Sequence, residues 1–176
     1  HLSQQAILQW QNLKGFLALN ADIFIRTFCL TFAFGFFYSQ SATEGTLILA
    51  ANVILLQFLN WMSYGVDGFA FASESLVGKY AGANDKPKTL QAIRLSFFWG
   101  MGLAALYALV YGFGGMAILE LFTNKVNVLA AARPFLIWMV IFPILSTPCY
   151  IWDGVFIGLT AAKAMRNSML LSLAVY

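Results

Sequence analysis

The longest apolar stretch of the chain runs from residue 46 to residue 82 and reads TLILAANVILLQFLNWMSYGVDGFAFASESLVGKYAG. It has no clear stop before Gly82. A continuous helix of this length would rise about 55 Å, well beyond the roughly 30 Å of bilayer hydrocarbon. We therefore predict a membrane-crossing helix that extends past the hydrocarbon. Gly65 and Gly68 lie near its middle and predict a bend or local unwinding there.

The composition of the whole chain supports a membrane location. Of 176 residues, 61% are hydrophobic and 10% are charged, and the mean hydropathy is +0.77. A soluble domain carries about 25% charged residues, which keep its surface wetted. Most of this surface is therefore predicted to face lipid. The 17 Phe, 7 Tyr and 5 Trp suit lipid contact and the headgroup boundary.

The remaining segments predict an all-α integral membrane protein. Residues 1–19 repeat apolar side chains at helical spacing, which predicts an amphipathic connector helix on the cytoplasmic surface. The chain starts at His1 rather than Met and ends at Tyr176 inside an apolar run, which predicts a piece of a longer protein. The transmembrane bundle is predicted over residues 20–176, with spans near residues 21–38, 46–82, 88–113 and 126–159 and a truncated fifth span over 165–176.

Local signals set the expected boundaries of these spans. Asn20 and Asp22 can cap the start of the first span, and residues 39–45 predict a polar turn after it. The glycines of residues 112–115 predict the end of the third span, followed by a short interfacial helix. Pro143 and Pro148 predict one bent helix, with a split into two short helices as the alternative.

The Lys and Arg residues indicate an orientation. With the N-terminus placed in the cytoplasm, the inside segments hold seven Lys or Arg, and the outside ends hold Lys125 and Arg133. Short cytoplasmic loops collect such residues. The bias favours four complete crossings and a cytoplasmic N-terminus, in a membrane that we expect to be the bacterial inner membrane.

Charged residues inside the spans are the first candidates for function, because each costs about 2.5–3.5 kcal/mol to insert. Asp67 is flanked by glycines and is predicted either to bind a proton or cation or to form a permanent pair with Arg26. A carboxylate beside a positive charge resists protonation. We assign Arg26 to a structural or switching pair with an acidic residue, with Asp67 and Glu74 as the candidates.

Asp153 is the first candidate for ion coupling and Asp67 the second. Asp153 follows Pro148, and a proline kink frees backbone carbonyls of the kind that coordinate Na⁺. A hydrogen bond between helices is the alternative role. Three amides interrupt the second span and are predicted to face protein or a water-filled cavity, as interhelical hydrogen bonds or substrate contacts: Asn52, Gln57 and Asn60.

No enzymatic motif is present in the sequence. The only histidine is His1, and GxSxG, HExxH, P-loop and dinucleotide-binding patterns are absent. The sequence predicts no enzyme, no cofactor, no metal beyond Na⁺ at Asp153, and no nucleic-acid partner. Ion-coupled transport is the economical interpretation.

Three motifs, in order along the chain, resemble the MATE multidrug and toxic compound extrusion transporters, and most closely the DinF-like branch. The first motif, DIFIRT at 22–27, resembles the start of that branch's seventh helix. The second motif resembles its eighth helix and reads LAANVILLQFL at 49–59 and SYGVDGFAFASESLVGKYAGAN at 63–84. The third motif resembles its tenth helix and the turn after it, and reads WDGVFIGLT at 152–160 and KAMRNSM at 163–169.

The resemblance implies a twelve-helix fold in two lobes, of which this chain is most of the C-terminal lobe. Its members export organic cations and other amphipathic compounds in exchange for Na⁺ or H⁺. In the NorM-like branch a tenth-helix aspartate helps to bind the cation, and Asp153 matches it. That branch's seventh-helix glutamate corresponds to Leu30, so this cation site is incomplete. Some DinF-like members couple protons through the N-terminal lobe, which is missing here.

The predicted function is therefore cation-coupled export of drugs or other amphipathic toxic compounds. The expected partners are a small-molecule substrate, H⁺ or Na⁺, membrane lipid and the missing N-terminal lobe. A lipid-linked precursor flippase is one alternative, but its cavity needs several cations, and the spans offer Arg26 and Arg133. A non-transporting membrane scaffold is another, in which Asp67 and Asp153 are structural.

Overall fold

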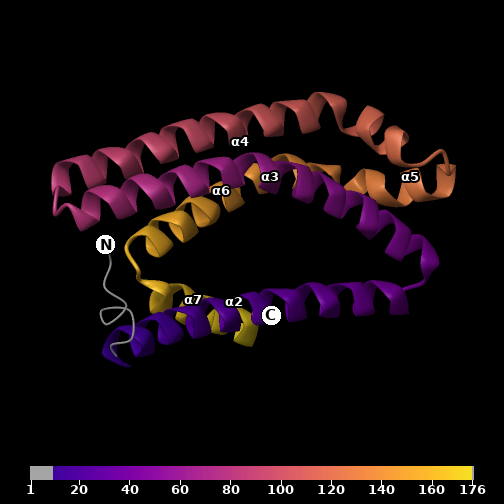
Figure 1. Ribbon diagram of the computed structural model, residues 1–176. Coiled ribbons are helices and arrows are strands. Elements are labelled where there is room, and N and C mark those ends of the chain that lie inside the picture. The colour runs from indigo at the N-terminus through magenta and orange to yellow at the C-terminus, as the bar shows by residue number, and fades with distance from the viewer. Residues whose placement is uncertain (1–9, 176) are drawn as a thin grey trace. The chain divides into compact units, whose positions relative to one another are not determined.

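The computed structural model describes residues 10–175, and that part of the chain contains helices and no strand (Figure 1). The all-α fold class predicted from the sequence is confirmed. The helical elements are α2 (Trp10–Thr43), α3 (Thr46–Gly82), α4 (Lys86–Phe122), α5 (Val126–Ala132), the 3₁₀ helix η1 (Arg133–Phe135), α6 (Leu136–Gly158) and α7 (Ala162–Val175).

Two compact units make up the chain. Among the described residues, 37–159 form one, and 10–36 together with 160–175 form the other. The described residues include four helical stretches long and apolar enough to cross a membrane: Asn20–Thr43, Thr46–Gly82, Lys86–Phe122 and Val126–Gly158. The prediction of four spans is confirmed.

Large apolar side chains cover the outside of these helices. Phe113 is 92% exposed, Phe98 69% and Leu121 79%. In water such a surface would drive association, because exposed apolar patches of this extent are rare on soluble monomers. The exposed side chains therefore fit a surface that lipid surrounds.

The core of the larger unit lies where α3 packs against α4 and α6. Phe58 and Met62 of α3 are completely buried, and the Phe58 ring meets Tyr111 of α4 edge-on at 4.9 Å between centroids. One face of α4 carries small buried residues at every fourth position: Ala92, Ser96, Gly100, Ala104 and Ala108. Small residues at this spacing let membrane helices approach closely.

Several predicted boundaries differ from the structure. Residues 1–9 of the expected connector lie outside the described residues, and from Trp10 onward the connector is continuous with α2. Asn20 and Asp22 are therefore inside a helix and do not cap one. α2 also runs through most of the expected turn and ends at Thr43, and the next helix starts after Gly45, whose φ of 106° suits glycine.

The other differences concern glycine and proline. The glycines at 112–115 do not end α4, which continues to Phe122, because neighbouring helices support glycine inside membrane helices. α3 stays helical at Gly65 and Gly68, although Figure 1 shows that it curves along its length. The predicted helix over residues 126–159 is interrupted at the 3₁₀ turn that contains Pro134, whereas α6 continues through both of its internal prolines.

Candidate functional site

α3 and α6 run in the same direction and keep a constant register. The Ser146 hydroxyl lies 4.0 Å from the Met62 sulfur. A Cβ added to Gly154 would overlap the Ala70 carbonyl oxygen, and one added to Gly158 would lie 2.6 Å from the Glu74 carbonyl oxygen. Each of these pairs is separated by 84 positions. A residue of α3 therefore lies beside the residue 84 positions later in α6.

This register places Asp67 and Asp153 at nearly the same height. Asp153 lies beside Phe69, two residues beyond Asp67, which is about 3 Å along the helix axis. Both aspartates are half-buried. Two carboxylates from different helices are thus brought to one level of the larger unit.

Both aspartates also lie on the side of the α3–α6 pair that faces away from α4. α4 approaches α3 at Gly65, where the Tyr107 ring lies against the glycine, and approaches α6 at Ile151, which lies against Gly100. Asp67 follows Gly65 by two positions, and Asp153 follows Ile151 by two positions. Two positions correspond to a rotation of about 200° around the helix axis. The carboxylates therefore project from the face opposite α4.

Further polar residues of α3 share this face. Asn60, Ser63, Asp67 and Glu74 follow one another at spacings of three, four and seven, so we call these four residues the polar face of α3. The Ser63 hydroxyl donates to the Asn60 carbonyl oxygen at 2.9 Å. Glu74 lies about 10 Å beyond Asp67 along the helix. The sequence analysis missed Ser63, although its spacing from Asn60 and Asp67 was available.

α6 contributes a matching set beside Asp153. Ser146, Tyr150 and Asp153 occur at helical spacings of four and three, and Ser146 donates to the Phe142 carbonyl oxygen at 2.8 Å. The sequence analysis singled out neither Ser146 nor Tyr150. A lone hydroxyl in a membrane helix is a weak signal, since it is usually satisfied by its own backbone.

The predicted amides divide between two environments. Asn52 Nδ2 donates to the Ser41 hydroxyl of α2 at 2.9 Å, which joins the end of α2 to the first part of α3. Asn60 Nδ2 donates to Gln57 Oε1 at 3.3 Å within α3. Of the three, Asn60 lies on the polar face.

The backbone carbonyls that the two prolines of α6 free lie far from Asp153. Pro148 removes the donor to the carbonyl of Ile144, and Pro143 removes the donor to that of Met139. Ile144 lies nine residues before Asp153, about 13 Å along the helix. Among residues 10–175, no three His, Cys, Asp or Glu side chains come together as a metal site. The two prolines therefore free no carbonyl at the level of Asp153.

Arg26 is half-buried in α2 and belongs to the smaller unit, whereas Asp67 and Glu74 belong to the larger one. Its pairing with either acid stays a prediction. Within the smaller unit the structure shows a pair that the sequence analysis missed. Asp22 is almost fully buried. Its carboxylate accepts a hydrogen bond from the Arg166 guanidinium of α7 and forms a salt bridge with it. The two residues are 144 positions apart, so no local pattern connects them.

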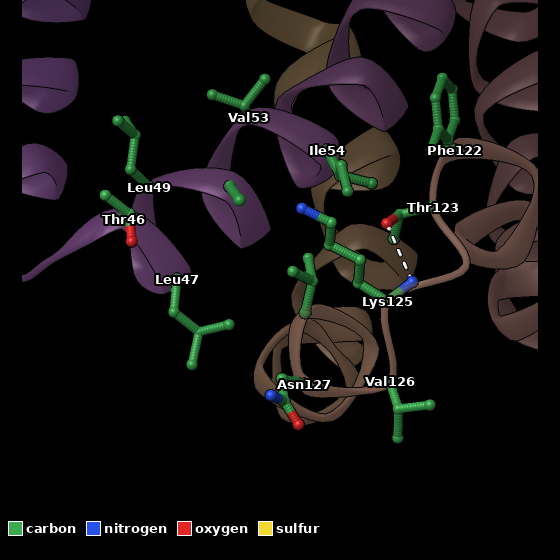
Figure 2. Close-up of a pocket in the computed structure, with 12 residues that line it drawn as sticks. Thr46, Leu47, Leu49, Val53, Ile54, Phe122, Thr123, Lys125, Val126 and Asn127 are labelled. Carbon is green, nitrogen blue, oxygen red and sulfur yellow. Dashed lines mark hydrogen bonds between the residues drawn. The ribbon is translucent and has the colours of Figure 1, made fainter.

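A separate pocket lies at the far end of the larger unit (Figure 2). It has a volume of about 870 Å³ and is lined by the first turns of α3 and by the link from α4 to α5. Figure 2 shows the Lys125 side chain extending across it toward Ile54, while the Lys125 backbone N–H donates to the Thr123 hydroxyl at 3.2 Å. None of the candidate residues predicted from the sequence lines this pocket.

Comparison with known proteins is consistent with this architecture. The MatE family model matches residues 23–176. The chain is 37% identical over 163 residues to DNA damage-inducible protein F of Escherichia coli (strain K12). That match covers 93% of this chain and 36% of the relative's length. No solved structure matches. Because the family model covers most of the sequence, the chain belongs to the MatE family of membrane transport proteins.

Proposed function

We propose that the protein of which this chain forms part is a cation-coupled antiporter that exports amphipathic toxic compounds, and that Asp153 and Asp67 couple the ion to transport. The family match and the DNA damage-inducible relative support membrane export. The observation that carries the coupling role is the common height of Asp67 and Asp153 on one face of the α3–α6 pair.

Two carboxylates at one level of a membrane helix pair favour the binding of a positive ion. A proton or a Na⁺ ion that binds at this level is attracted by both negative charges. The cost of placing a charged carboxylate within a membrane helix adds to this preference. An ion bound more tightly in one conformation than in the other shifts the population between them, which is the requirement for coupling.

The close crossing of α3 and α6 supports the same role. Gly154 directly follows Asp153, and its backbone lies against the Ala70 carbonyl. The spacing between the two helix backbones that carry the aspartates is thereby fixed by direct contact. Such preorganisation lowers the cost of ordering the site when an ion binds.

The proposed orientation places the α3–α4 turn in the cytoplasm. Residues 79–94 hold four basic side chains and one acidic side chain. The opposite end of the larger unit has Lys125 and Arg133. The positive-inside bias favours the cytoplasm for the richer end, and a bacterial inner membrane fits a chain with this topology.

The test uses the full-length protein in proteoliposomes with an imposed proton or Na⁺ gradient. Asp153→Asn is expected to abolish gradient-driven efflux of an organic cation while leaving substrate binding without a gradient measurable. Asp67→Asn is expected to lower efflux less. Asp85→Asn, a carboxylate at the α3–α4 turn and outside the polar face, serves as the matched control and is expected to transport normally.

Gradient-driven efflux in both the Asp153→Asn and Asp67→Asn proteins at the control rate would rule out the coupling role. The two aspartates would then be structural, as the scaffold alternative requires.

A further inference from the structure

Two lysines converge on a single aromatic ring at the α3–α4 turn. The Lys79 ammonium lies 5.7 Å from the centroid of the Tyr80 ring, and the Lys88 ammonium lies 5.9 Å from the same centroid. The ring attracts each cation through its quadrupole. The tyrosine therefore holds two like charges together at the end of the hairpin, although they repel each other.

The surrounding residues leave this positive charge largely uncompensated. Residues 79–94 contain the basic residues Lys79, Lys86, Lys88 and Arg94 and one acid, Asp85. Asp85 pairs with the Lys88 ammonium at 2.9 Å, and its other oxygen accepts the Lys88 backbone N–H at 3.1 Å. These contacts lower the pKa of the Asp85 carboxyl, so it stays ionised and neutralises one cation of the four.

The surplus of three positive charges in this segment equals the net charge of the entire chain. Along α3, the nearest acidic residue before this segment is Glu74, five residues before Lys79. The basic end of the hairpin is thus a locally concentrated positive surface, and an anion is its complement.

Exposed apolar side chains continue directly from these cations along both helices. On α4, Lys88, Leu95 and Phe98 occur at positions i, i+7 and i+10, which is one face of the helix, and Leu95 and Phe98 are exposed. On α3, Leu76 precedes Lys79 by one turn and is also exposed. A molecule with an anionic head and apolar chains matches this arrangement.

We propose that Lys79, Tyr80 and Lys88 form a binding site for the headgroup of an anionic phospholipid, whose acyl chains lie against Leu76, Leu95 and Phe98. The lipid belongs to the leaflet that this end of the hairpin meets. Clusters of Lys and Arg at the end of membrane helices bind such headgroups, and each cation adds to the affinity. The site is distinct from the polar face of α3 and does not depend on the proposed ion coupling.

The test measures lipid retention by native mass spectrometry of the full-length protein with phosphatidylglycerol or phosphatidylcholine. The double variant Lys79→Gln/Lys88→Gln is expected to lower phosphatidylglycerol retention about 30-fold. Retention of phosphatidylcholine is expected to be unchanged. Lys125→Gln, which removes a cation from the opposite end of the same unit, is the matched control and is expected to retain phosphatidylglycerol normally.

A second pair of variants tests the tyrosine. Tyr80→Phe keeps the ring and is expected to retain phosphatidylglycerol, whereas Tyr80→Leu removes it and is expected to lower retention several-fold. Equal retention by these two variants would overturn the role of the ring. An equal loss in Lys125→Gln and in the double variant would overturn the site, since it would show attraction by overall charge.

Discussion

α3 contacts its two neighbours in different ways. Against α4 it uses side chains, because the Tyr111 hydroxyl donates to the Phe58 carbonyl oxygen at 2.7 Å and the Tyr107 hydroxyl to the Trp61 carbonyl oxygen at 3.2 Å. Against α6 the backbones meet at Gly154, with no side chain between them. A side-chain interface adjusts by changing rotamers, whereas a backbone interface adjusts only if a helix moves.

This difference bears on which helices move together. The aspartates of the candidate site lie on the two helices whose backbones are in contact, so α3 and α6 are expected to move as one body. The α3–α4 interface has exchangeable hydrogen bonds and is the more adaptable of the two. Substitutions at the two interfaces should therefore differ in both size and kind of effect.

The largest effect is expected from Gly154→Ala. The added methyl group would overlap the Ala70 carbonyl oxygen, which is backbone, so the two helices must separate. Overpacking of this kind costs about 1–3 kcal/mol of unfolding free energy. We expect a matching fall in the unfolding midpoint of the full-length protein in detergent, and a loss of gradient-driven efflux as the aspartates move apart.

Gly102→Ala is the control for this substitution. A Cβ at Gly102 of α4 meets nothing within 4 Å, so alanine there adds helix propensity without a clash. We expect stability to be unchanged or raised by up to about 1 kcal/mol. If Gly154→Ala were as stable as Gly102→Ala, the backbone contact between α3 and α6 would not exist as described.

A smaller effect is expected from Tyr111→Phe. The variant keeps the ring, which packs edge-on against Phe58, and removes a buried hydrogen bond. Hydrogen bonds between membrane helices contribute about 0.6 kcal/mol on average and up to about 1.7 kcal/mol. We expect a loss within that range on unfolding in mixed micelles, without a change in ion coupling. Tyr64→Phe, at a side chain that is 76% exposed, is the control and should cost nothing measurable.

Sequence reasoning located the spans and the two aspartates because both signals are local. Apolar length identifies a membrane helix, and a charge such as Asp67 within it is conspicuous in the printed sequence. The pairing of Asp22 with Arg166 was missed, because Asp is a common residue at a helix start and its partner lies far along the chain. The common height of Asp67 and Asp153 depends on the α3–α6 register, which contacts between distant segments determine.

Helix breaks were predicted least well, for a related physical reason. A proline inside α6 was expected to dominate its shape, yet Pro143 is fully buried and the helix continues through it, while the interruption occurs near Pro134. Whether a proline ends a helix depends on which neighbours satisfy the freed carbonyls. Those neighbours come from other helices and are not specified by the local sequence.

The smallest effect is expected from Tyr107→Phe. Its hydrogen bond to the Trp61 carbonyl is 3.2 Å long against 2.7 Å for that of Tyr111, so it is the weaker of the two. We expect a loss below about 0.5 kcal/mol in the same unfolding experiment. A loss as large as that of Tyr111→Phe would mean that the α3–α4 interface is held uniformly along its length. The two tyrosine rings lie 5.7 Å apart, so the double variant measures their coupling directly, and additive losses would show that each hydrogen bond acts alone.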